Sequence, residues 1–214
     1  MSLSSSYPSP SPRAPFRTLG ILGGTFDPPH YGHLALAENA RVQLKLDRVL
    51  FAPAGQQPLK SGQTPAHTDH RVAMVRTVTA DSDAFALSCV DLDRPGPHYT
   101  VDTVSLLRDE YQEATFYFLL GGDSLAQLLS WRDPAGILEQ VRLAVMRRPG
   151  YEPDVDELTR ALPRLPERLS WLDVPSLDIS STDLRRRVRE SLPLRYLTPP
   201  QIEVYIQKHR LYVT

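Results

Sequence analysis

The sequence predicts an α/β fold in which a doubly wound, mostly parallel β-sheet is covered by helices on both faces. Three observations support this prediction. Short apolar runs recur along the chain, helical patterns lie between them, and the runs are continuous rather than alternating. Continuous apolar runs are typical of strands buried on both faces, and strands that alternate with helices are typical of parallel sheets.

The predicted strands are short apolar runs that end in polar or Gly- and Pro-containing segments. They lie at residues 18–22, 48–52, 85–90, 115–120, 142–146 and 169–173. Amphipathic periodicity predicts helices at residues 32–45, 68–80, 100–112, 123–140, 154–162, 181–191 and 199–209. Ligands of such sheets bind at the carboxyl ends of the strands, so the segments that follow each strand are the ones to inspect.

A chain of 214 residues can bury one large core. We expect a single domain over residues 18–214, with a small C-terminal helical part that begins near residue 180. The first residues are rich in Ser and Pro and show no hydrophobic periodicity, so residues 1–17 are predicted to be a flexible tail.

Composition excludes several classes of protein. A formal net charge of -1 provides no overall field for nucleic acid or for an anionic membrane, so we expect neither partner. Cys89 is the single cysteine, which excludes an intramolecular disulfide and a thiolate zinc cluster. No apolar stretch is long enough to cross a bilayer, and no secretory signal is apparent, so we expect a cytoplasmic protein. The oligomeric state, including a homo-oligomer, is left open.

The segment after the first strand has the features of a phosphate site. It runs from Gly23 to His33, Gly-Gly-Thr-Phe-Asp-Pro-Pro-His-Tyr-Gly-His, and a helical pattern follows at once. Glycines let backbone approach a ligand closely, and free N–H groups at a helix start attract anions. His30 and His33 are three residues apart, so both rings can face one bound group and stabilise charge on phosphate oxygens.

Other interpretations of these residues are open. A Gly-Gly turn occurs at many strand-to-helix corners, and a histidine near a helix start is commonly a surface residue. His30 and His33 could also bind a metal ion with His67 and His70, which share the H-x-x-H spacing. The sequence has no H-E-x-x-H pattern and no cysteine cluster, so we predict no protein-ligated metal.

A second phosphate element is predicted where the last strand leads into a helix. Ile179 to Arg185 reads Ile-Ser-Ser-Thr-Asp-Leu-Arg, with hydroxyl groups at a helix start and an arginine one turn inside. Such a group can hold the phosphates of a nucleotide. Ser180 and Asp183 also have the spacing of a capping box, and on that reading the segment is only a helix start.

Both segments resemble signatures of the nucleotidyltransferase superfamily. Gly24 to His33 is similar to its G-x-F-D-P-x-H-x-G-H motif, and Ile179 to Arg185 to its I-S-S-T-x-[IL]-R motif. The resemblance implies direct attack of an acceptor phosphate on the α-phosphorus of the substrate ATP, with His30, His33 and Arg185 as catalytic residues. The implied ATP-binding residues are Gly23, Gly24, Thr25, Phe26, His30, His33, Ile179, Ser180, Ser181, Thr182 and Arg185.

The remaining strand ends resemble the nicotinate mononucleotide adenylyltransferases of bacterial type. The shared blocks are Pro53 to Lys60, His70-Arg71, Arg94 to Thr103, Gly121-Gly122-Asp123, Arg148-Pro149 and the ending from Leu197 to Tyr212. The resemblance implies a nicotinate pocket and contacts to the ribose and phosphate of the acceptor. Its residues would be Lys60, Tyr99, Thr100, Gly122, Asp123, Trp131 and Arg148.

Three points stay open in this resemblance. The chain has His98 and Leu59 where the family usually has Ser and often has His. Instead of binding the acceptor, Tyr99, Thr100 and Asp123 could serve simply as helix caps, and Trp131 could simply pack on a neighbouring helix. The acceptor could instead be nicotinamide mononucleotide or phosphopantetheine, or the chain could be a nucleotide-binding regulator without activity.

We expect in-line displacement with Mg²⁺ as cofactor, held mainly by substrate phosphates and water.

Overall fold

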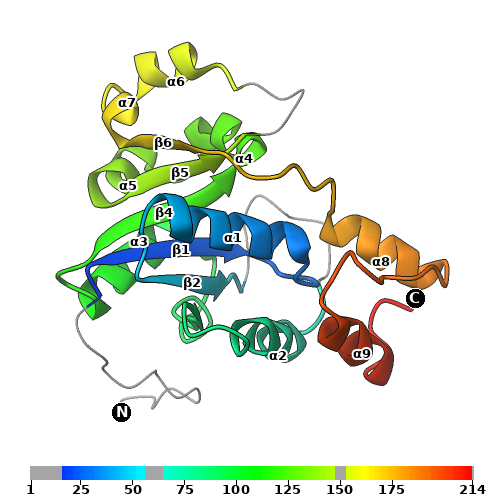
Figure 1. The fold of residues 1–214 in the computed structure, drawn as a ribbon. Coiled ribbons are helices and arrows are strands. Elements are labelled where there is room, and N and C mark those ends of the chain that lie inside the picture. Colours follow the sequence, from blue (N-terminus) through cyan, green and yellow to red (C-terminus); the bar gives the residue numbers. More distant parts are fainter. Residues whose placement is uncertain (1–15, 56–64, 148–152, 214) are drawn as a thin grey trace.

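A computed structural model describes residues 16–55, 65–147 and 153–213. Its centre is a six-stranded sheet with the order β3-β2-β1-β4-β5-β6, in which every neighbouring pair is parallel (Figure 1). The strands are β1 (Thr18–Gly24), β2 (Arg48–Pro53), β3 (Phe85–Leu87), β4 (Thr115–Gly121), β5 (Arg142–Met146) and β6 (Leu169–Leu172). The chain leaves β1 toward β2 on one side and returns to β4 on the other, so the strand order reverses between β1 and β4.

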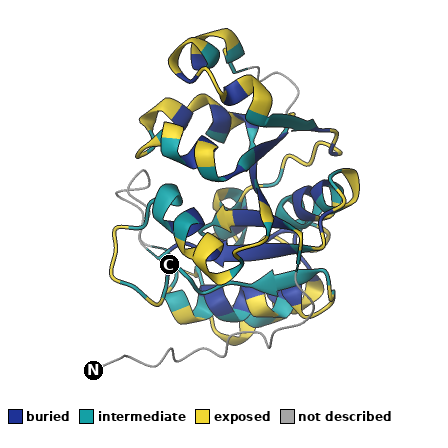
Figure 2. Cartoon of the chain, turned by 90° about the vertical axis from the view of Figure 1, so that its left-hand side faces the viewer, coloured by how far each residue is buried: buried dark blue, intermediate teal, exposed yellow. Residues whose placement is uncertain are grey.

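Helices cover both faces of this sheet. They are α1 (Tyr31–Gln43), α2 (Thr68–Thr79), α3 (Thr100–Glu110), α4 (Gly122–Ala126), α5 (Pro134–Gln140), α6 (Val155–Ala161), α7 (Leu165–Arg168), α8 (Ser181–Arg189) and α9 (Pro200–Lys208), with a 3₁₀ turn η2 (Leu128–Ser130). On one face, α3 and α5 pack on residues such as Ile21 and Leu143. On the other, α1 and α2 pack on residues such as Leu22 and Phe51. Figure 2 shows the buried residues along the strands between these layers.

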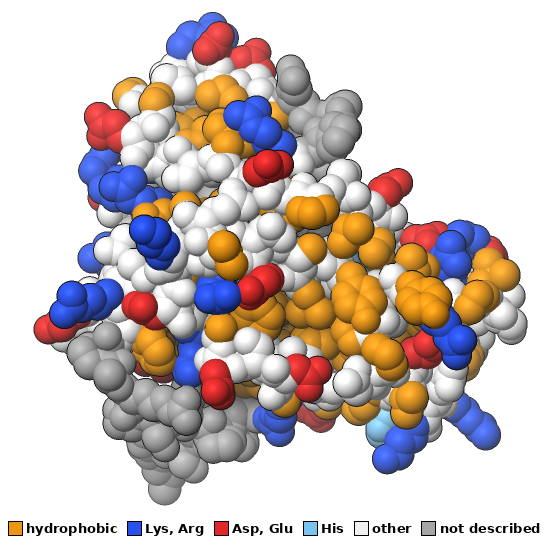
Figure 3. All heavy atoms as spheres, viewed as in Figure 1, with side chains coloured by type: hydrophobic (Ala, Val, Ile, Leu, Met, Phe, Trp, Pro, Cys, Tyr) orange, Lys and Arg blue, Asp and Glu red, His pale blue; other side chains and the backbone are white. Residues whose placement is uncertain are grey.

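The C-terminal helices form a smaller apolar cluster with α2. Leu184 of α8 and Ile202 of α9 are fully buried together with Met74 of α2. This packing carries the start of α8 toward the end of β1, as Figure 1 shows. On the face seen in Figure 3, hydrophobic side chains gather over α1 and toward α8, while basic and acidic side chains are interspersed, as the near-zero net charge predicts.

The structure differs from the sequence prediction at three elements, one of which is α7, a short helix where none was predicted. The helix predicted at 123–140 is divided into α4, η2 and α5, because Pro134 begins α5 and Asp133 before it is left-handed, with φ 49°. The third strand ends at Leu87 rather than at residue 90, because the Cys89 carbonyl accepts from the Leu92 and Asp93 N–H groups in a turn. Cys89 is half-buried, and burial raises the pKa of its thiol.

The predicted N-terminal tail overlaps the described residues only at Phe16 and Arg17. The Arg17 N–H donates to the Asp47 carboxylate at 2.7 Å, and the Phe16 ring lies under the Arg48 guanidinium at 4.6 Å. Residues 1–15 lie outside the described part of the chain. Contacts with the first strand's neighbours therefore begin at Phe16, two residues before the predicted domain boundary at residue 18.

Candidate active site

The site lies at the carboxyl end of β1, where the strand order reverses. The loop from Thr25 to His30 joins β1 to α1, and His30 is the N-cap of that helix. Phe26 is 1% exposed, has a left-handed φ of 51°, and packs against His33 and Phe51. A Cβ on Gly24 would lie 3.3 Å from the Phe26 ring. Phe26 therefore shapes the loop from inside, and Gly24 leaves room for it.

The two motif histidines lie against each other. Their ring centroids are 3.8 Å apart, and the His30 N–H donates to Nδ1 of His33 at 3.2 Å. Because Nδ1 accepts, the neutral His33 ring carries its proton on Nε2. His30 is 7% exposed, and a Cβ on Gly32 would lie 3.0 Å from its ring. The two rings therefore lie side by side, and Gly32 provides the space that this arrangement needs. That both rings face one bound group stays a prediction.

The loop between β1 and α1 is held by side chains from distant parts of the chain. Four carbonyl oxygens accept, namely Thr25 O from Arg71 Nη1 (2.9 Å), Asp27 O from Arg185 Nη1 (2.8 Å), Pro28 O from Ser181 Oγ (2.9 Å) and Pro29 O from Thr198 Oγ1 (2.8 Å). Two of these carbonyls belong to prolines, which have no N–H to donate in a turn of their own. Tertiary contacts therefore determine the backbone path of the loop.

These contacts bring together the two segments that the sequence singled out. Ser181 lies 153 residues after Pro28, and Arg185 lies 158 residues after Asp27. The Ile179 carbonyl also lies 3.8 Å from a Cβ built on Gly32. The predicted juxtaposition of the segments near His33 and near Ser181 is confirmed. Their predicted contacts with ATP phosphates stay a prediction.

The start of α8 is capped, but not by a complete capping box. Ser180 Oγ accepts from the Asp183 N–H at 3.1 Å, as predicted. The Asp183 carboxylate instead binds Arg187 at 2.7 Å and Arg186 at 2.6 Å, and these bonds lower its pKa. Thr182 Oγ1 accepts from Nη2 of Arg185 at 3.3 Å. Arg186 and Arg187 therefore lie in a solvated ion-pair network.

Arg71 is a site residue whose role sequence reasoning missed. It is 1% exposed, and it donates to Thr25 O, Ala54 O (2.7 Å), Ala66 O (3.1 Å) and Thr68 Oγ1 (3.1 Å). Burial lowers its pKa, and the nearby Asp27 and Tyr212 act in the opposite direction. The His70-Arg71 block was visible in the sequence, but its pattern did not indicate that the guanidinium joins the ends of β1 and β2.

The predicted acceptor residues that the structure describes lie in the segments that follow β3 and β4. Tyr99 is the N-cap of α3 without a side-chain cap bond, and the Arg132 guanidinium lies 4.6 Å above its ring. The neighbouring Trp131 meets Phe118 edge-on at 6.0 Å. Arg132 therefore connects the loop before α3 with the loop that carries Trp131.

Thr100 and Gly122 are the first residues of α3 and α4, and Asp123 lies in the first turn of α4. The N-cap of α4 is Gly121, so Asp123 is not its cap. A Cβ on Gly121 would lie 2.5 Å from Oδ1 of Asp123, so the carboxylate folds back over this glycine. Lys60 and Arg148 lie outside the described residues.

His98, where the family usually has serine, bridges two strand ends. Its Nε2 lies 3.1 Å from the Arg94 carbonyl, and its ring occupies the space beside Gly55. Arg94 in turn binds the buried Asp91 carboxylate at 2.8 Å, and Thr103 donates to the same carboxylate. The unusual histidine is thus accommodated because residue 55 has no side chain.

We expect Gly55→Ala to lower the free energy of unfolding by about 1–3 kcal/mol, since the added Cβ would lie 2.6 Å from the His98 ring. Urea unfolding of the purified variant measures this loss. The matched control is the same change in a His98→Ser background, where the smaller side chain should remove most of the loss. Equal losses in the two backgrounds would contradict the contact.

Among the described residues, no group of three His, Cys, Asp or Glu side chains could hold a metal ion. His67 accepts from the Asp69 N–H at the start of α2, and His70 Nδ1 lies 3.0 Å from the Tyr205 hydroxyl. In this H-x-x-H pair, His67 therefore caps α2, and His70 contacts α9. None of the helices in the described ranges is both long and apolar enough to cross a membrane.

Comparison with known proteins assigns the family. The cytidylyltransferase-like profile matches residues 21–187. A probable nicotinate-nucleotide adenylyltransferase of Roseiflexus sp. (strain RS-1) is 52% identical over 194 residues, covering 91% of this chain and 97% of the relative. One of Thermomicrobium roseum is 46% identical over 196 residues, covering 92% of each chain.

A solved structure agrees on the fold. The nicotinic acid mononucleotide adenylyltransferase of Plasmodium falciparum, complexed with NaAD, superimposes with a TM-score of 0.76 at 19% identity. The match covers 92% of this chain and 97% of that one. Together with the motif loop and the second segment that meet at the end of β1, these likenesses show that the chain belongs to the nicotinate-nucleotide adenylyltransferase family, within the cytidylyltransferase-like proteins.

Proposed function

We propose that the protein transfers the adenylyl group of ATP to nicotinate mononucleotide, forming nicotinate adenine dinucleotide and releasing pyrophosphate. The family and the names of its relatives support this reaction. The observation that carries it is the contact of Ser181 and Arg185 with the loop that bears His30 and His33. This contact gathers two helix starts, an arginine and two imidazoles at one end of β1, as two polyanionic substrates require.

In the proposed step, an oxygen of the mononucleotide phosphate forms a bond to the α-phosphorus of ATP. The bond from that phosphorus to the β-phosphate oxygen breaks, and the electron pair leaves with pyrophosphate. The attacking phosphate has a second pKa of about 6 and is largely ionised at neutral pH, so a strong general base is not needed. The protein's task is to align the two substrates and to stabilise charge on the phosphate oxygens.

Different residues bind the triphosphate and the mononucleotide. The Nε2–H of His33, beside His30, donates to phosphate oxygens as their charge grows. The backbone of Gly23, Gly24 and Thr25 and the hydroxyl groups at the start of α8 line the triphosphate. Arg185 reaches the same place from α8, with Nη1 2.8 Å from the Asp27 carbonyl. In the segments that follow β3 and β4, Tyr99, Thr100, Asp123 and Trp131 receive the mononucleotide.

The described residues fit a Mg²⁺ ion that is held mainly by substrate oxygens and water. The carboxylate of Asp27, a residue of the loop between β1 and α1, already accepts hydrogen bonds from the Tyr212 hydroxyl and the Ala66 N–H. Bound Mg²⁺ would neutralise charge on the phosphates of ATP. The cytoplasmic location expected from the sequence stays a prediction and belongs to this proposal.

The test is incubation of the purified protein with ATP, Mg²⁺ and one acceptor at a time, followed by mass spectrometry and a pyrophosphate assay. We expect nicotinate adenine dinucleotide with nicotinate mononucleotide, and a kcat/KM at least about tenfold lower with nicotinamide mononucleotide, because the two acceptors differ by one charge. Phosphopantetheine is expected to give no product. Equal or greater turnover of either alternative would replace the proposed acceptor, and no turnover of any would indicate a regulator.

A further inference from the structure

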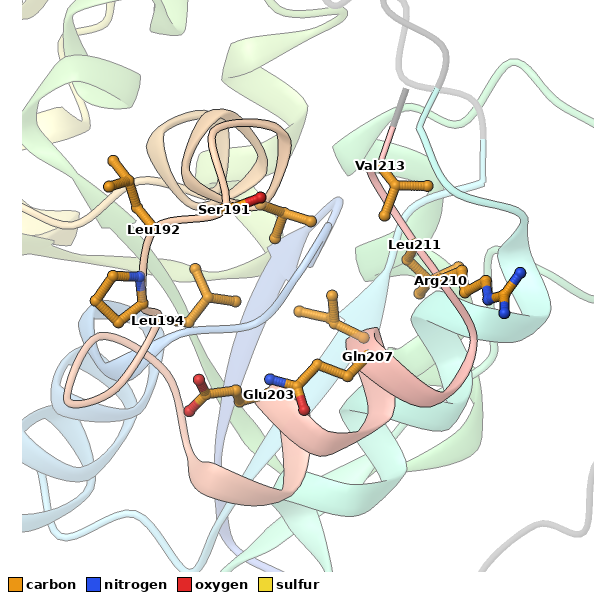
Figure 4. Close-up of a pocket in the computed structure, with 11 residues that line it drawn as sticks. Ser191, Leu192, Leu194, Glu203, Gln207, Arg210, Leu211 and Val213 are labelled. Carbon is orange, nitrogen blue, oxygen red and sulfur yellow. The ribbon is translucent and has the colours of Figure 1, made fainter.

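The end of the chain returns to the phosphate loop. After α9, Arg210 and Tyr212 have left-handed φ angles of 49° and 65°, and the chain turns back along α2 and α8. Figure 1 shows the C-terminus beside α8 and α9, and Figure 4 shows Leu211 and Val213 beyond α9, at the rim of a pocket. Leu211 and Tyr212 both pack against the apolar cluster of α2, α8 and α9. This anchoring directs the Tyr212 ring toward the loop between β1 and α1.

The Tyr212 hydroxyl is hydrogen-bonded to a buried carboxylate, that of Asp27. It donates to Oδ1 of Asp27 at 2.7 Å, and the Ala66 N–H donates to the same oxygen at 3.2 Å. Asp27 is 3% exposed, so its carboxylate depends on protein groups for solvation. Burial and the adjacent Asp27 raise the pKa of Tyr212 far above its usual value. The tyrosine therefore remains a neutral donor over the whole working range of pH.

Asp27 also determines where Arg185 lies. Nη1 of Arg185 is 2.8 Å from the Asp27 carbonyl and 3.5 Å from Oδ2 of the Asp27 carboxylate. One nitrogen thus contacts two acceptors of the same loop residue, the neutral carbonyl and the charged carboxylate of Asp27. The hydroxyl of Tyr212 stabilises negative charge on Oδ1, which weakens the attraction that remains for the guanidinium. Without the hydroxyl, the carboxylate would draw Nη1 of Arg185 away from the Asp27 carbonyl and toward Oδ2.

We propose, resting on the adenylyl transfer proposed above, that Tyr212 is a positioning residue for the triphosphate. It holds the Asp27 carboxylate so that Arg185 stays at the Asp27 carbonyl, on the loop that receives ATP. The C-terminal segment is in this way part of the ATP site although it does not touch the reacting atoms. The acceptor side, with Tyr99 and Trp131, does not depend on this contact.

The test is Tyr212→Phe, which keeps the ring and removes only the hydroxyl. We expect the KM for ATP and the Kd for a non-hydrolysable ATP analogue to rise about tenfold, the effect of one charge-assisted hydrogen bond. The KM for nicotinate mononucleotide should stay within about twofold, because Tyr212 acts only on the ATP side. A general structural weakening would change both KM values, so this division separates positioning from packing.

The matched control is Tyr205→Phe, which removes a hydroxyl that lies 3.0 Å from His70 Nδ1, between α9 and α2. We expect this variant to keep the wild-type KM and Kd for ATP. If Tyr212→Phe binds the analogue as tightly as the wild type, the proposal is wrong. If the wild type makes no dinucleotide but Tyr212→Phe still weakens ATP binding, the proposed acceptor reaction fails and the positioning role stands.

A double variant keeps the test decisive if Tyr212→Phe unfolds. Asp27→Asn with Tyr212→Phe removes the buried charge together with its donor, so no uncompensated carboxylate is left. Its ATP affinity should lie within about twofold of Asp27→Asn alone, since Tyr212 acts through that carboxylate. A further tenfold loss in the double variant would show that Tyr212 acts by another route and would overturn the proposal.

Discussion

His33→Ala is expected to lower kcat by about 10²–10³-fold, the range that follows from removing one preorganised donor from a developing oxyanion. His33 is half-buried at the start of α1, and its Nδ1 accepts from the His30 N–H, so Nε2 carries the proton that the phosphate oxygens need. The KM for ATP should change less than kcat, because the interaction strengthens as charge develops. Steady-state pyrophosphate release, with varied ATP, measures both constants.

The control for this variant is His67→Ala, whose side chain is 76% exposed at the start of α2. It should leave kcat within about twofold of the wild type, as expected of an exposed residue away from the chemistry. Thermal melts of both variants test whether the fold survives. Turnover of His33→Ala near the wild-type value would remove this histidine from the mechanism.

Arg71→Met is expected to lower the free energy of unfolding by about 3–5 kcal/mol, because one buried and three partly buried acceptors lose their donor at once. The guanidinium joins the end of β1, the end of β2 and the start of α2 through Thr25, Ala54 and Ala66. Its charge also faces Asp27, which would remain buried without it. Urea unfolding, followed by circular dichroism, measures the loss.

Arg76→Met is the matched control, because Arg76 lies on the same helix and is exposed. Its free energy of unfolding should stay within about 0.5 kcal/mol of the wild type, as for most surface substitutions. Equal losses for the two variants would mean that the Arg71 hydrogen bonds add nothing beyond helix packing. Arg71→Lys should recover little, since one ammonium group cannot reproduce the planar set of guanidinium donors.

Local patterns in the sequence were sufficient to predict the sheet. Each of the six apolar runs is a strand, and all pairs are parallel, because a continuous apolar run between amphipathic helices can be buried only between two helical layers. The errors occur where a single residue overrides the periodicity. Pro134, with the left-handed Asp133 before it, divided a stretch whose apolar spacing suits one helix.

The pairing of His30 with His33 was also predictable, because residues three apart at a helix start share one face. The location of the site followed from the rule for parallel sheets and from the two motif segments. Asp27, Arg71, Thr198 and Tyr212 received no role, although all of them lie in blocks that the sequence displays. Nothing in their local pattern distinguishes a buried partner of the loop from an exposed polar residue.

The sequence by itself determined where the strands lie along the chain, where the phosphate loop follows β1, and that His30 and His33 share one face. Each of these features depends on residues close together in the chain. Only the tertiary structure decided the path of the loop. Its carbonyls, two of them on prolines, find donors in side chains 46 to 169 residues away. Such donors reach the loop only after α2, α8 and α9 have packed together. A hydrogen bond across that separation leaves no signature in local periodicity, so the sequence alone did not reveal these contacts.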